Sequence, residues 1–134
     1  MALQLSVAVR NAMLDAIETT IGTSAVMKIR TGAPPAGCAT ADSGTVLATL
    51  TLSNWMADAS SGTKAKSGTW EDTSADAAGT AGHYRIYAND GTTCHMQGTV
   101  TATGGGGDLT VDNVVFAAGQ SFTVTSYSWT AANS

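Results

Sequence analysis

The sequence predicts a mainly β protein, an antiparallel β-sandwich of jelly-roll-like or immunoglobulin-like type, preceded by one N-terminal α-helix. From residue 83 onward, short runs rich in Val, Ile, Phe, Tyr and Thr are separated by turn segments such as Asn89-Asp90-Gly91, a pattern typical of antiparallel strands. A helical repeat of apolar residues is clear only near the N-terminus. The chain has 134 residues, of which 43% are hydrophobic, enough for one domain with a core. We therefore expect a single domain, 1–134, with a helix over 5–21 and the sandwich over 25–129.

The helix is predicted from apolar residues that recur every four positions, with Ser6 as a plausible N-cap and Gly22 as a plausible stop. This stripe consists of Leu5, Val9, Met13, Ile17 and Ile21. The opposite side carries Arg10, Asn11, Asp15 and Glu18. The stripe packs on its own domain, which is the commoner arrangement, or docks on another subunit. Val9, Met13 and Ile17 are accordingly candidate interface residues.

Alternating apolar and polar residues predict the strands. The expected strands cover 25–32, 45–52, 82–88, 94–101, 108–117 and 120–129. Residues 53–81, rich in Ala, Ser, Gly and Thr, are interpreted as mostly loop with one or two short strands. The four glycines 104–107 predict a flexible loop tip, and such tips often become ordered at an interface, so Gly105 and Gly106 are candidate interface residues. Tyr127 and Trp129 share one strand face and are either core residues or interface anchors.

The composition argues against several classes of partner. The net charge is −4 and no basic run is present, so we expect no nucleic-acid binding. No apolar run approaches the ~20 residues of a membrane-spanning helix, and the first residues do not resemble a secretory signal. Charged residues make up only 12% of the chain, about half the usual share. A weakly charged surface costs little to desolvate, which suits burial against a protein partner.

No pattern in the sequence predicts catalysis, a metal site or a cofactor. Cys94 and His95 are neighbours on a predicted strand and point to opposite faces, so they do not easily share one ion. Gly-x-Ser-x-Gly is absent from the sequence, and the carboxylates of Glu71 and Asp72 are interpreted as solvated loop groups. Free buried thiols are the expected state of Cys38 and Cys94, with a disulfide as the alternative. We expect that the protein is not an enzyme.

The sequence resembles a family of small proteins encoded among the structural genes of tailed bacteriophages. The resemblance covers nearly the whole chain, and its most specific segments are KIRTGAPP (28–35), TAGHYRIYANDGT (80–92) and LTVDNVVFAAGQ (109–120). It implies a virion component with a β-sandwich body. No catalytic residue carries over from the family, because the matching motifs consist of turns, strand cores and glycine hinges.

The function expected from this resemblance is a capsid cement or decoration protein that stabilises the phage head across neighbouring capsomers. The expected partner is the major capsid protein or another virion protein. We also expect a homo-oligomer, made in the host cytoplasm and located in the virion, without nucleic-acid or membrane partners. Two alternatives are a tail, neck or baseplate ring component and a carbohydrate-binding or receptor-binding β-module.

Overall fold

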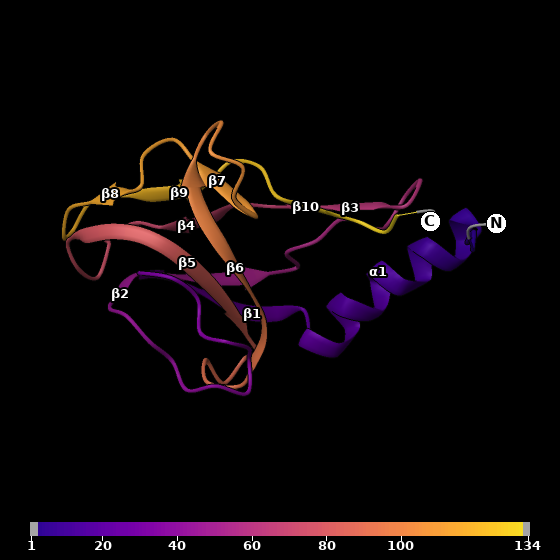
Figure 1. Cartoon of the computed structure of the whole chain (residues 1–134), viewed down its shortest axis with the longest axis horizontal. Helices are drawn as coiled ribbons and strands as arrows, with labels where there is room; N and C mark the ends of the chain where they lie inside the picture. Colours follow the sequence, from indigo (N-terminus) through magenta and orange to yellow (C-terminus); the bar gives the residue numbers. More distant parts are fainter. Residues whose placement is uncertain (1–2, 133–134) are drawn as a thin grey trace.

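The computed structural model describes residues 3–132 and confirms a mainly β chain that follows one N-terminal helix (Figure 1). The elements in chain order are α1 (Val7–Ile21), β1 (Ser24–Thr31), β2 (Val46–Ser53), β3 (Thr63–Ala65), β4 (Trp70–Asp72), β5 (Gly79–Tyr87), β6 (Cys94–Ala102), β7 (Leu109–Val111), β8 (Val115–Phe116), β9 (Phe122–Val124) and β10 (Ser128–Thr130). Ser6 caps the helix as expected, since its side chain accepts a hydrogen bond from the backbone N–H of Val9, and Gly22 ends it with φ of 99°.

The main sheet has the strand order β2-β1-β5-β6-β7, with β8 paired to the beginning of β5. Its strand pairs are antiparallel except β6–β7, which is parallel. Two separate two-stranded ladders, β3–β10 and β4–β9, complete the described part of the chain. The sheet curls into a half-barrel (Figure 1). This mixed, curled sheet with two small ladders differs from the antiparallel sandwich that we expected.

The difference arises in the last third of the chain, where two expected strands become four short ones. The segment 108–117 divides into β7 and β8, because the Asn113 side chain accepts a hydrogen bond from the backbone N–H of Val115 (2.9 Å) and turns the chain. The segment 120–129 divides into β9 and β10, which pair with β4 and β3 respectively. The apolar pattern therefore identified strand-forming residues correctly but not their partners.

A glycine-rich reversal makes the parallel β6–β7 pair possible. Parallel neighbours usually need a connection of a dozen or more residues, whereas here residues 103–108 suffice. Gly106 has φ of 80°, and a Cβ on Gly105 would lie 2.7 Å from the Cβ of Thr101. The Gly107 N–H donates to the Thr101 hydroxyl (2.9 Å). The segment thus folds back along β6, with Gly104, Gly105 and Gly106 exposed. The flexibility expected of this tip stays a prediction.

The core lies on one face of the main sheet, where the two ladders approach it. An aromatic cluster occupies this region, and Tyr127 is at its centre with 8% of its surface exposed. Its ring centroid lies 5.4 Å from that of Trp70 and 5.8 Å from that of Tyr84, and its hydroxyl is 2.6 Å from the Tyr84 hydroxyl. Trp129 is half-buried and packs edge-on against Trp55. Of the two alternatives for Tyr127, core residue or interface anchor, the structure therefore supports the core residue.

We predict that Gly105→Ala destabilises the protein by about 1–3 kcal/mol, because the added methyl group overlaps Thr101 in the reversal. Urea unfolding followed by circular dichroism measures this change. Gly37→Ala is the matched control, since a Cβ there meets nothing within 4 Å. Equal stability of the two variants would show that the reversal does not need a glycine at this position.

Candidate functional site

The helix α1 packs on its own domain through its polar side. It lies against β3, and we call α1 together with the β3–β10 ladder the arm. Figure 1 shows the arm extending from the curled sheet. The Arg10 guanidinium donates to the carbonyl of Ala131 (3.4 Å), and the Asn11 side chain accepts from the N–H of Gly62 (2.9 Å). Polar contacts therefore hold this part of the helix to the ladder.

A buried lysine is at the centre of these contacts. Lys64, on β3, is 1% exposed. Its ammonium donates to the Asp15 carboxylate (2.7 Å) and to the Ala57 carbonyl (2.9 Å), and it lies 3.7 Å from the Glu18 carboxylate. The hydrogen bond from Lys64, with a second from the backbone N–H of Ala59, lowers the pKa of Asp15. A charge buried this deeply needs partners, and the helix provides them.

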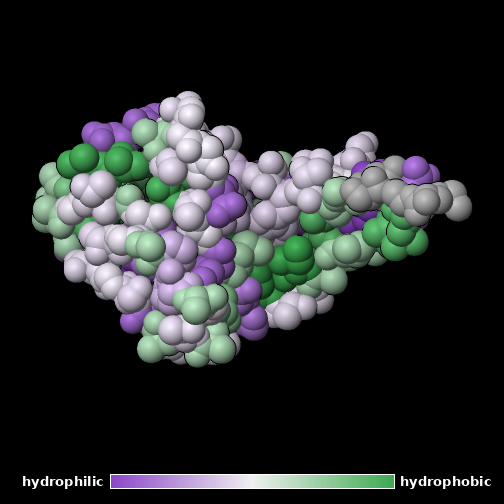
Figure 2. Space-filling model, viewed as in Figure 1, coloured by the Kyte–Doolittle hydropathy of each residue, from purple (hydrophilic) through white to green (hydrophobic). Residues whose placement is uncertain are grey.

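Because the polar side faces the ladder, much of the apolar stripe faces outward. Val9 is 46% and Met13 is 50% exposed, while Ile17 is half-buried and contacts the core. Figure 2 shows hydrophobic residues gathered along the arm. The expectation that the stripe packs on its own domain is therefore wrong for Val9 and Met13. The buried helix residues are Leu14, which lies beside the stripe, and Ile21, the last residue of the stripe, for which the expectation is confirmed.

A shallow groove lies beside this face, between the second half of α1 and the beginning of β6. Its volume is ≈ 300 Å³. The lining residues are Met13, Ala16, Ile17, Thr20, Ile21 and His95. Two of the predicted interface residues, Met13 and Ile17, thus meet in one apolar depression that a partner side chain could fill.

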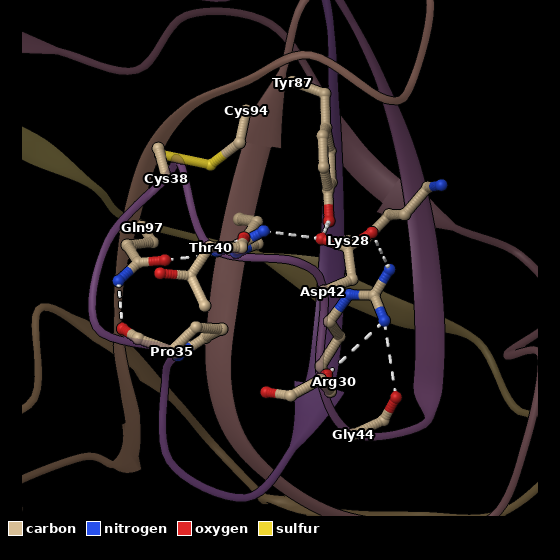
Figure 3. Close-up of polar contacts among 12 residues, drawn as sticks. Lys28, Arg30, Pro35, Cys38, Thr40, Asp42, Gly44, Tyr87, Cys94 and Gln97 are labelled. Atoms are coloured by element: carbon tan, nitrogen blue, oxygen red, sulfur yellow. Dashed lines mark hydrogen bonds and ion pairs between the residues drawn. A yellow bond between two sulfur atoms is a disulfide. The ribbon is translucent and has the colours of Figure 1, made fainter.

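The second notable feature is the polar segment that connects β1 to β2, residues 32–45, which we call the strap. It crosses the face of the main sheet that lies opposite the aromatic cluster (Figure 3). Asp42 is its central residue. The Asp42 carboxylate accepts hydrogen bonds from Arg30 (2.9 Å), Arg85 (2.7 Å) and the Tyr87 hydroxyl (2.7 Å). Arg85 is 2% exposed and also donates to two carbonyls of the strap. The strap therefore covers the cationic side chains on this face of the sheet. The alternation of apolar and cationic residues along β1 and β5 would otherwise leave these side chains exposed to solvent.

The electrostatics of Asp42 follow from these partners. Partial burial raises the pKa of the carboxyl, but the hydrogen bonds from Tyr87 and Arg85, together with the charges of Arg30 and Arg85, outweigh that effect and hold its pKa below the usual value. Tyr87 responds in the opposite direction, since burial and its hydrogen bond to Asp42 raise its pKa. Asp42 is therefore ionised under ordinary conditions and binds both guanidinium groups to the strap.

A disulfide between Cys38 and Cys94 joins the strap to the beginning of β6 (Figure 3). The expectation of free thiols is therefore wrong. The two cysteines are 56 residues apart in the chain, and they meet only because the strap returns across the sheet. The Gln97 side chain adds a hydrogen bond to the Pro35 carbonyl (2.6 Å).

The remaining predicted interface residues lie away from the outward face of α1. Gly105 and Gly106 belong to the reversal after β6, Tyr127 lies in the core, and Trp129 is half-buried on β10. The structure thus brings Val9, Met13 and Ile17 together on α1 and does not join the other four to them.

A polar depression of ≈ 500 Å³ lies near β10. The two charged groups in its wall are already engaged. The Lys66 ammonium donates to the Gly68 carbonyl (2.8 Å), and the Asp108 carboxylate accepts from the backbone N–H and hydroxyl of Thr99 (2.9 and 3.1 Å). Among residues 3–132, no group of three or more His, Cys, Asp or Glu side chains could hold a metal ion. The expectation that the chain is not an enzyme stays a prediction.

No helix in the described part of the chain is long and apolar enough to cross a membrane. Comparison with known proteins finds no matching family model, curated protein or solved structure.

We predict that Asp42→Asn lowers the free energy of unfolding at pH 7 by about 1–2 kcal/mol, allowing for solvent screening of a carboxylate that is 38% exposed. Because the folded-state pKa of Asp42 is lowered, its contribution is fully present above the unfolded-state pKa of about 4 and is lost as the pH falls through the folded-state value. The difference between wild type and variant in urea unfolding should therefore shrink from pH 7 to pH 3. Asp58→Asn, at an exposed position, is the control, and a difference that stays constant with pH would contradict the role of the Asp42 charge.

We also predict that the double substitution Cys38→Ser with Cys94→Ser lowers the free energy of unfolding by up to about 4 kcal/mol, the value expected for closing a loop of this length. Thermal unfolding with and without dithiothreitol provides the test. Reductant should lower the Tm of the wild type and leave the Tm of the variant unchanged. Two reactive thiols in the untreated, folded wild type would contradict the disulfide.

Proposed function

We propose that the chain is a structural protein of a tailed-phage virion, and more specifically a capsid cement or decoration protein that binds the assembled head across neighbouring subunits. The observation that carries this proposal is the outward face of α1. Val9 and Met13 remain about half exposed there although the chain has a well-formed core. An apolar face of this kind is typical of a surface that another protein covers.

The contacts that fix the strap on the main sheet support the same role. The disulfide and the Asp42 contacts fix the strap on the sheet, and disulfides persist in the oxidising surroundings that a released virion meets. A protein that binds only the assembled shell stabilises that shell by mass action. Many equivalent copies then compensate for modest affinity at each site.

The alternatives differ in what they require of the surface. A carbohydrate-binding or receptor-binding module needs exposed aromatic rings grouped on one face, but every tryptophan and tyrosine of the described chain is buried or half-buried. A tail, neck or baseplate ring component would use the same outward face of α1, and its location in the particle distinguishes it from a cement protein.

Immunogold electron microscopy of intact particles, with antibody against the purified chain, tests the proposal. We expect label distributed over the head and no label on the tail. Label confined to the tail, the neck or the tail tip would contradict a cement role and favour the ring component. If purified particles carry no label and mass spectrometry detects no copy of the chain in them, any virion role would be contradicted.

Particles that lack the chain provide a second measurement for the same proposal. We expect their heads to release DNA at a lower temperature than complete particles, and adding the purified chain should restore the original temperature. The tail protein content of both preparations is the control. Equal heat stability with and without the chain would contradict stabilisation of the head.

A further inference from the structure

We propose that the outward face of α1 pairs with the same face of a second copy of this chain, so that two arms cross in a two-fold symmetric dimer. This inference rests on the proposed function and deepens it, because it names the protein that covers this face as a second copy attached to a neighbouring site on the shell. It is tested on the purified chain in solution, whereas the virion role is tested on particles, so each can fail without the other.

The first argument is the charge of the face. The exposed residues on this side of the helix are Ala8, Val9, Ala12, Met13, Ala16, Thr19 and Thr20. These residues include no ionisable group; Arg10 and Glu18 are turned toward the ladder. The Asp15 side chain borders the face and is 48% exposed, but its charge is paired with the Lys64 ammonium. Two copies can therefore meet across this face without bringing like charges into contact, although each chain carries a net charge of −4.

The same lack of charge argues against other classes of partner. Nucleic acid and anionic lipid are bound mainly through Lys and Arg. The only basic residue of α1 is Arg10, whose guanidinium binds the carbonyl of Ala131 on the inner side. A protein face that is itself apolar and uncharged fits best, and a second copy of α1 provides one.

The second argument is the shape of the face. Residues four apart form ridges along a helix. Ala8, Ala12 and Ala16 form a low ridge, and Val9 and Met13 form the exposed part of a high ridge beside it, which continues inward in the half-buried Ile17. In a two-fold pair, the high ridge of one copy lies in the groove above the low ridge of the other, which is the packing of helices that cross at about −50°.

The size of the face predicts a weak pair. An exposed helix side of 15 residues offers on the order of 400 Å², so the two copies bury on the order of 800 Å² in total. The groove beside β6 adds to this area. Such an interface is at the small end of specific contacts, and we expect a dissociation constant on the order of 100 µM.

Sedimentation equilibrium of the purified chain, from about 10 to about 500 µM, provides the test. We expect a monomer–dimer equilibrium that hardly changes with salt concentration, since the interface has no ion pairs. Met13→Lys should weaken dimerisation more than about 10-fold, because it buries an unpaired charge. Val115→Lys is the matched control, since Val115 is 57% exposed on β8, away from the arm, and it should leave dimerisation unchanged.

Ala12→Leu separates specific packing from general adhesion. The larger side chain makes the face more apolar but fills the low ridge, so we expect weaker dimerisation. A chain that stays monomeric throughout, a species larger than a dimer, or a dimer that persists in Met13→Lys would overturn the proposal. Stronger association in Ala12→Leu, or loss of association in Val115→Lys, would also overturn it. Circular dichroism establishes that each variant is folded.

Discussion

The buried ammonium of Lys64 is the constraint on which the orientation of the arm depends. A charge with 1% exposure must be paired, and its anionic partners, Asp15 and Glu18, are three residues apart on one side of α1. Satisfying Lys64 therefore rotates this side of the helix toward the ladder. The middle of the apolar stripe must then face away from it, so that Val9 and Met13 remain exposed, whereas the stripe's last residue, Ile21, turns back into the core. One ion-pair cluster thus links the local fold to the surface that we propose as an interface.

The main sheet shows the same use of buried charge on a larger scale. Strands β1 and β5 place apolar residues such as Ile29 and Ile86 in the core and cationic residues on the opposite face. That second face would be solvated in an ordinary two-layer protein. Here the strap covers it, because Asp42 neutralises part of the charge and the disulfide fixes the covering segment. Both faces of the central strands are consequently buried, and the exposed apolar surface is concentrated on the arm.

Local signals in the sequence predicted local structure well. The helix with its Ser6 cap, the four long strands and the hairpin at Asn89-Asp90-Gly91 all lie within a few residues of their predicted positions, because capping and alternation depend on near neighbours. Long-range choices were not predictable. Lys64 is 49 residues from Asp15, and no periodicity shows that a strand lysine will be buried under the helix. The pairing of Cys38 with Cys94 and the partners of β7 to β10 depend likewise on the complete topology, so the predicted interface residues were divided among separate regions.

The weakness of the proposed helix pair fits the multiplicity of a shell. Because Val9 and Met13 stay half exposed, each contributes roughly 1 kcal/mol less to the free energy of folding than it would if fully buried. A folded chain tolerates this loss when its core is complete. In dilute solution, a dissociation constant on the order of 100 µM keeps most chains monomeric. Binding to adjacent sites on a shell raises the effective concentration of neighbouring copies to the millimolar range. The same face that is too small to hold two free chains together would then be covered on the particle, so that pairing follows attachment to the shell and adds to the stability of the assembled head.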